Sequence, residues 1–186
     1  QPGNVPPPSI SVKLSALHPR YERAKRELVL AELGASLGKL AQLAREREVM
    51  ITIDAEEADR LELALELFRQ VFESDVVRGW TGFGLVVQAY SKRCLPVLAW
   101  LAAQARKNNN RIPLRLVKGA YWDSEVKWSQ MGGYTSYPVY TRKAGTDVSY
   151  LACARFILAQ DSTVFYPQFA THNAQTVANI LDFAGT

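Results

Sequence analysis

The chain has 186 residues, a length that suits one domain, and its 48% hydrophobic and 22% charged residues are ordinary for a globular protein. The net charge of +4 is spread along the sequence, so no basic block indicates nucleic-acid binding. No apolar run approaches the roughly 20 residues that span a bilayer, and no signal-peptide pattern is visible. Cys94 and Cys153 lack paired-thiol spacing, which predicts a reducing compartment without a disulfide framework.

Segments typical of strands and of helices alternate along the chain. The proline-rich residues 1–8 predict a linker, and residues 9–186 predict one domain. We expect strands at 10–14, 50–54, 84–88, 114–118 and 164–171. We expect helices at 22–48, 56–72, 94–107, 147–160 and 173–185, with a longer connection over 121–146. The last helix can begin at an Asn173 cap and stop at Gly185. This alternation predicts an α/β fold with a parallel sheet.

The faces of the expected strands differ in character. Residues two apart in a strand share a face, so large apolar residues such as Ile51 and Ile53 form a side that packs on helices. The opposite faces carry four polar side chains: Lys13, Asp54, Gln88 and Arg115. If the sheet curls into a barrel, these four point into its hollow near one mouth. A flat sheet covered on both faces would tolerate them poorly, so a TIM-like catalytic barrel is favoured.

The charges of this set suggest its chemistry. Lys13, Asp54 and Arg115 leave the hollow with one positive charge in excess, which suits a small anionic substrate or a cofactor that becomes anionic. Further binding groups follow the fourth and fifth strands: Gly119 and Ala120 for close backbone approach, Tyr121 and Trp122 for stacking, and Thr171, His172 and Asn173 for hydrogen bonds.

Several of these residues also have structural explanations. Asp54 followed by Glu57 matches a helix cap with a reciprocal glutamate. Lys13 can reach solvent from an edge strand, and Arg115 can form a buried ion pair with Asp54 or Glu56. The functional reading depends on their joint occurrence at strand ends.

Other chemistries are less well supported by the sequence. No metal site is expected, because His18 and His172 are the only histidines and the acidic residues after Ile53 lack a second cluster. A Schiff-base lysine remains an alternative, as in aldolases. Lys118 shares its phase with the helix-facing residues of its strand, which makes it a weaker nucleophile candidate than Lys13.

Six ordered motifs, covering nearly the whole chain from Ser9, resemble proline dehydrogenases. They are similar above all to the proline dehydrogenase domain of bifunctional proline utilization A enzymes of bacteria. The motifs are 13–21 (KLSALHPRY), 54–57 (DAEE), 88–90 (QAY), 115–122 (RLVKGAYW), 137–143 (YPVYTRK) and 169–173 (FATHN).

The resemblance implies an enzyme with a distorted (βα)8 barrel and non-covalent FAD, which oxidises L-proline to Δ1-pyrroline-5-carboxylate by hydride transfer to the flavin. It implies that Asp54 and Arg115 form the catalytic pair, that Lys13 contacts the substrate carboxylate and that Tyr121 lines the proline pocket. It further implies a set of cofactor contacts: Ala55, Gln88, Arg115, Lys118, Gly119, Ala120, Thr141, Arg142, Lys143, Thr171, His172 and Asn173. A cytoplasmic protein that passes electrons to a membrane quinone, and attaches peripherally to the inner membrane during turnover, is also implied.

The motif set is shorter than the family pattern. About five βα units are expected here, against eight in the family barrel, so residues 9–186 predict an incomplete portion with little activity in isolation. The opening strand, a later helix with adjacent arginines and the NAD-dependent aldehyde dehydrogenase domain are expected to be missing. Two alternatives stay open: a non-catalytic, self-associating barrel fragment, and an aldolase-type barrel.

Overall fold

The computed structural model describes residues 7–185, and its centre is a five-stranded, all-parallel sheet. The strands lie in the order in which they follow one another along the chain: β1 (Ser9–Val12), β2 (Met50–Ile53), β3 (Phe83–Gln88), β4 (Ile112–Val117) and β5 (Phe165–Phe169). Sequential neighbours that all run parallel need a crossover between each pair, and helices supply these crossovers. The expected α/β fold is confirmed.

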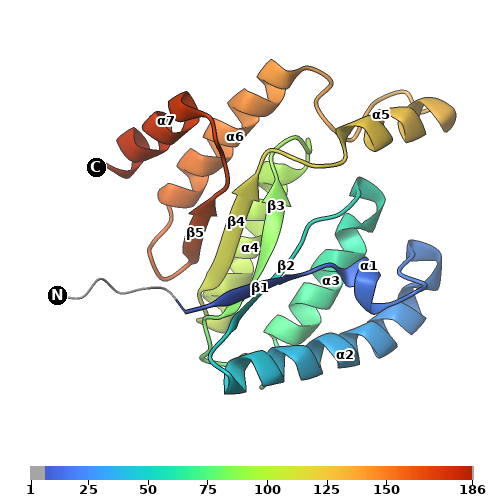
Figure 1. The fold of residues 1–186 in the computed structure, drawn as a ribbon, viewed down its shortest axis with the longest axis vertical. Coiled ribbons are helices and arrows are strands. Elements are labelled where there is room, and N and C mark those ends of the chain that lie inside the picture. The colour runs from blue at the N-terminus through green and yellow to red at the C-terminus, as the bar shows by residue number, and fades with distance from the viewer. Residues whose placement is uncertain (1–6, 186) are drawn as a thin grey trace.

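Most of the helices pack on one side of this sheet, as Figure 1 shows for α4 behind β3 and β4, whereas α5 lies beyond the ends of the strands. They are α1 (Leu14–Leu17), α2 (Arg26–Glu46), α3 (Leu61–Phe72), α4 (Cys94–Asn108), α5 (Trp122–Met131), α6 (Lys143–Leu158) and α7 (Ala174–Ala184), with 3-10 turns η1 (Arg23–Lys25) and η2 (Ala58–Arg60). The core lies between the helices and the sheet. There, Phe68 on α3 stacks on Phe83 of β3, with ring centroids 5.3 Å apart. On the other face, Arg115 and Asp54 stay partly exposed, with 26% and 27% of their side-chain surfaces accessible.

The sheet is curved, and its uncovered face is concave. Arg115 on β4 donates a hydrogen bond to Ser11 on β1, with 2.9 Å between Nη1 and Oγ. These strands are three neighbours apart, which is about 14 Å in a flat sheet and beyond the reach of the two side chains together. The contact therefore requires strands that bend toward each other, as in the wall of a barrel.

The structure differs from the expected elements mainly between residues 121 and 146. The expected connection contains helix α5, and α6 begins at Lys143 instead of residue 147. Helix α5 does not show the apolar inner face of a usual amphipathic helix, because it buries Glu125 and Ser129 while Trp128 and Met131 are exposed. Its apolar residues do not mark the inner face, so the usual signal is reversed.

The two ends of the described chain can be compared with the predicted linker and the predicted last helix. Residues 1–6 of the expected linker lie outside the described residues, and Pro8 already belongs to the sheet, because its carbonyl accepts from the Met50 N–H at 2.8 Å. At the other end, the Asn173 side chain caps α7 by accepting from the Thr176 N–H at 2.9 Å. Gly185 ends α7 with a φ of 73°, as expected for a left-handed cap.

Candidate functional site

Arg115 is the centre of the polar groups on the concave face. Besides Ser11, its guanidinium donates from Nε to Gln168 Oε1 on β5 at 3.3 Å. Nη1 also lies 3.9 Å from Asp54 Oδ1, at the carboxyl end of β2. The planar guanidinium thus contacts groups from β1, β2 and β5, and its side chain remains 26% exposed. A cation so fixed and still accessible can stabilise negative charge on a bound molecule.

A second cation lies at the same mouth. Lys13 follows β1 directly, and its Nζ donates to the Tyr121 hydroxyl at 3.2 Å. That hydrogen bond raises the pKa of the Lys13 ammonium, and the charges of Glu56 and Asp54 add smaller effects in the same direction. Lys13 therefore stays protonated at neutral pH, and its side chain is exposed.

Gln88 has a bridging role at the end of β3. Its side-chain Nε2 donates to the Glu56 carbonyl at 2.9 Å, and its Oε1 accepts from the Ala120 N–H at 3.0 Å. One buried amide therefore ties the loop after β2 to the turn after β4. Both of these hydrogen bonds are to backbone groups, so Gln88 fixes the positions of the two loops that it joins.

Gly119 forms the tight part of the turn after β4. Its φ is 147°, a conformation that L side chains rarely adopt, and an added Cβ would lie 2.4 Å from the Tyr90 ring. Glycine is therefore needed for the turn to pack against Tyr90, while the exposed backbone of Gly119 lines the cavity beside the turn.

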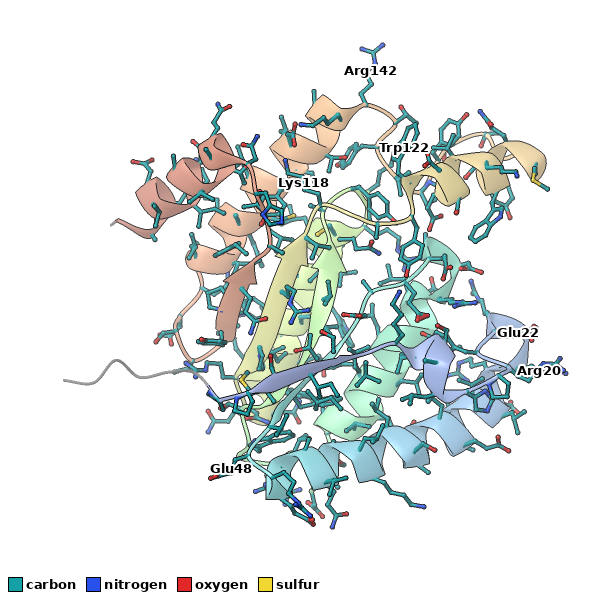
Figure 2. All side chains as sticks on the ribbon, in the orientation of Figure 1. Arg20, Glu22, Glu48, Lys118, Trp122 and Arg142 are labelled. Atoms are coloured by element: carbon teal, nitrogen blue, oxygen red, sulfur yellow. The ribbon has the colours of Figure 1, made fainter. Side chains whose placement is uncertain are left out.

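A cavity of about 390 Å³ opens beside this turn, and it gathers several of the expected cofactor contacts. Its walls include Lys118, Gly119, Thr141 and Lys143. The distant segment reaches this place because the Tyr140 N–H donates to the Tyr90 carbonyl at 2.8 Å. In Figure 2, Lys118 lies above the sheet near Trp122, whereas Arg142 points away from the body of the molecule.

Asp147 on α6 orients both lysines of this cavity. Its Oδ1 lies 2.5 Å from Lys118 Nζ and its Oδ2 lies 2.6 Å from Lys143 Nζ. The hydrogen bonds from Lys118 and Lys143 hold the Asp147 pKa below its ordinary value. Two lysines and one aspartate leave one positive charge, which suits an anionic group such as a phosphate.

The other residues that were expected to contact the cofactor differ in their burial and in their contacts. Thr171 is half-buried and accepts through Oγ1 from the Asn173 N–H at 3.1 Å, while Asn173 is used as the α7 cap. His172 between them is exposed. Ala55 is half-buried and lines a second, small cavity of about 50 Å³, whose walls also include Asp54 and Gln88.

Two of the structural alternatives, for Asp54 and Arg115, and the predicted strand phase of Lys118 can now be compared with the geometry. Asp54 does not cap η2, whose first turn begins after Glu57. Arg115 lies near Asp54, as the ion-pair alternative predicted, and it also contacts β1 and β5. Lys118 is held by Asp147 on the helix side, as its strand phase predicted.

The sequence analysis missed several residues of the site. Ser11 and Gln168 share the concave face with Arg115, and strand phase could have found them once the strand register was known. Glu56 accepts from the Ser15 side chain at 2.7 Å and from its N–H at 3.2 Å, which ties the loop after β2 to α1. No sequence pattern indicated Glu125, because its hydrogen-bond partner, Ala58, lies 67 residues away in the sequence. Among residues 7–185, no group of three potential metal ligands forms, and no helix is long and apolar enough to cross a membrane.

Polar side chains gathered at the carboxyl ends of parallel strands, inside a curved wall backed by helices, define the class of α/β-barrel enzymes. The match to known sequences makes the assignment specific. The family model for proline dehydrogenase matches residues 1–186, and the chain belongs to that family.

Individual relatives agree with this assignment. The chain is 54% identical over 178 residues to the bifunctional protein PutA of Klebsiella aerogenes, covering 96% of this chain and 14% of that relative. It is 51% identical to the bifunctional protein PutA of Rhizobium meliloti, again over 96% of this chain and 14% of the relative. It is 30% identical to proline dehydrogenase 1 of Bacillus subtilis over 82% of this chain and 41% of that protein.

Solved structures show the same fold. A proline utilization A structure from Bradyrhizobium japonicum superposes with a TM-score of 0.93 at 50% identity, covering 96% of this chain and 18% of that one. The enzyme from Bdellovibrio bacteriovorus, inactivated by N-propargylglycine, gives a TM-score of 0.90 at 32% identity over 94% of this chain and 18% of that one. The chain thus spans less than a fifth of these proteins.

Proposed function

We propose that this chain is part of a flavin-dependent proline dehydrogenase, which oxidises L-proline to Δ1-pyrroline-5-carboxylate. The observation that carries the proposal is Arg115, held by Ser11 and Gln168 beside Asp54 in the hollow of the sheet. Membership of the proline dehydrogenase family supports this reading of the site. The roles below are those of the protein that contains the chain.

The two accessible cations suit the substrate. Proline is a small zwitterion, and a carboxylate beside the Lys13 ammonium gains a charge-assisted hydrogen bond. Tyr121, held by Lys13, forms one wall of the pocket and limits how the ring can turn. Arg115 and Asp54, one cation and one carboxylate, act at the reacting end, where Arg115 stabilises negative charge as it develops.

The residues around Gly119 fit FAD. A flat, anionic cofactor suits the exposed backbone at Gly119 and the cationic cavity beside it. When bound, FAD would supply the redox chemistry by accepting the hydride from proline. Lys118, Lys143 and Thr141 would hold the anionic part, and Gln88 would keep the turn in place. The proposed set of cofactor contacts also includes seven further residues: Ala55, Arg115, Ala120, Arg142, Thr171, His172 and Asn173.

The further partners are those that the resemblance to proline utilization A implies. We infer that the electrons removed from proline would pass to a membrane quinone. The protein would then attach peripherally to the inner membrane from the bacterial cytoplasm. A second domain of the same polypeptide would use NAD to oxidise the product as an aldehyde dehydrogenase. The 54% identity to bifunctional PutA proteins supports this arrangement.

The proposal is tested with protein expressed from the complete reading frame. We expect a yellow protein whose flavin absorbance bleaches on anaerobic addition of L-proline and returns with a quinone analogue. A colourless, stable oligomer would favour the non-catalytic reading. Trapping of a carbonyl substrate on Lys13 or Lys118 by borohydride would favour the aldolase reading instead.

Replacing Lys13 with methionine is expected to raise KM for L-proline about 10- to 100-fold, with a smaller change in kcat. The substitution removes a charge-assisted hydrogen bond worth about 1.5 to 3 kcal/mol and leaves the aliphatic stem. Steady-state kinetics with a quinone analogue measures this. Lys39→Met, on the exposed side of α2, is the matched control. An unchanged KM in Lys13→Met would remove Lys13 from the substrate site.

A further inference from the structure

Helix α5 is unusual because its inner face is polar. The helix buries Glu125, with 4% of its surface exposed, while Trp128 and Met131 are 48% and 74% exposed. Burying a carboxylate costs free energy unless a specific partner compensates, whereas an apolar residue would pack there without that cost. The arrangement therefore needs a reason beyond helix packing.

Within residues 7–185, the Glu125 side chain makes one long-range hydrogen bond, and it is to the loop that carries Asp54. Its Oε1 accepts from the Ala58 N–H at 2.6 Å, where η2 begins. Burial raises the pKa of the Glu125 carboxyl, and Asp59 and Glu57 add to this, while the Ala58 N–H opposes it. Among residues 7–185 the structure gives Glu125 no salt bridge, so the backbone N–H is its compensating partner.

The loop after β2 is held at both ends and in its middle. The Asp54 N–H donates to the Val12 carbonyl at 2.9 Å, which fixes the loop start to β1. Gln88 holds its middle through the Glu56 carbonyl at 2.9 Å. Glu125 is the contact that fixes its far end. Without it, no hydrogen bond within residues 7–185 would join Ala58 to the elements across the mouth.

The same helical turn also carries Tyr121. The Glu125 N–H donates to the Tyr121 carbonyl at 3.0 Å, so the two residues are one turn apart on a rigid element. Tyr121 in turn accepts from Lys13. A shift of α5 relative to the loop would therefore move the proposed pocket wall relative to Asp54.

We propose that Glu125 is a positioning residue: through Ala58 it locks the loop after β2 to α5 and so sets the distance between Asp54 and Tyr121. This inference rests on the proposed function and adds a residue that touches neither substrate nor cofactor. Displacements near 1 Å can cost about 100-fold in rate. The carboxylate is required as a hydrogen-bond acceptor, and its charge is secondary.

The test uses the protein from the complete reading frame. Glu125→Ala is expected to lower kcat/KM for L-proline about 10- to 100-fold and to speed amide exchange in a peptide covering residues 54–60. Glu125→Gln keeps an acceptor oxygen of the same reach, so its kcat/KM and exchange should stay within about threefold of the parent. Ser129→Ala is the matched control, because Ser129 is buried on the same face but bonds only to the Glu125 carbonyl within the helix.

The outcomes separate this inference from the proposed function. Unchanged kcat/KM and exchange in Glu125→Ala would overturn the positioning role, as would a Glu125→Gln variant as impaired as Glu125→Ala. A Ser129→Ala variant with the same loss would assign the effect to helix packing and also overturn it. If L-proline failed to bleach the parent flavin, the proposed function would be wrong, and the positioning role for that reaction would fall with it.

Discussion

Replacing Arg115 with methionine is expected to lower kcat/KM for L-proline about 100- to 1,000-fold. In the proposed function Arg115 is the cation at the reacting end of the hollow, and loss of one such preorganised donor typically has an effect of about this size. The change also leaves Asp54, whose side chain is 27% exposed, without its neighbouring cation. Stopped-flow measurement of flavin bleaching separates this chemical step from later electron transfer.

Two further variants sharpen the Arg115 result. Arg115→Lys keeps the charge but loses the planar fork that reaches Ser11 and Gln168 together, so an intermediate rate is expected. Arg111→Met removes an arginine that stacks over Tyr166, with 5.3 Å from Cζ to the ring centroid, at the amino end of β4. Its bleaching rate should match the parent. An Arg115→Met rate within threefold of the parent would exclude a catalytic role for Arg115.

Replacing Gly119 with alanine is expected to weaken FAD binding about 100-fold and to destabilise the turn after β4. The φ of 147° disfavours an L residue, and the new Cβ would lie 2.4 Å from the buried Tyr90 ring. Strain and overpacking each cost about 1 to 3 kcal/mol, so a total of about 3 kcal/mol is expected. If the turn must regain its present shape to bind FAD, this corresponds to a factor of roughly 100 in affinity.

The matched control for Gly119 is Gly133. It also has a positive φ, of 63°, but nothing lies within 4 Å of an added Cβ. Gly133→Ala should therefore cost only about 1 to 2 kcal/mol, from backbone strain alone, and leave flavin content unchanged. Flavin per polypeptide and the temperature of flavin release measure both variants. Equal flavin retention in the two would show that the Gly119 turn does not form part of the cofactor site.

The sequence by itself determined the order and type of most elements. At least one helix follows each strand, and period-two phase separated the helix-facing apolar residues of β2 from Asp54 and of β4 from Arg115. Local chemistry also fixed both ends of α7, because a side-chain cap and a left-handed glycine depend on neighbouring residues only. These features need no knowledge of the rest of the fold.

Only the tertiary structure decided which groups meet. The curvature of the sheet brings Ser11 to Arg115, and register brings in Gln168; neither can be read from one strand alone. Helix α5 was missed for the related reason that its inward carboxylate, Glu125, compensates its burial through Ala58, 67 residues away. Periodicity reports whether a side chain is apolar, whereas a buried polar contact depends on a partner that folding alone supplies.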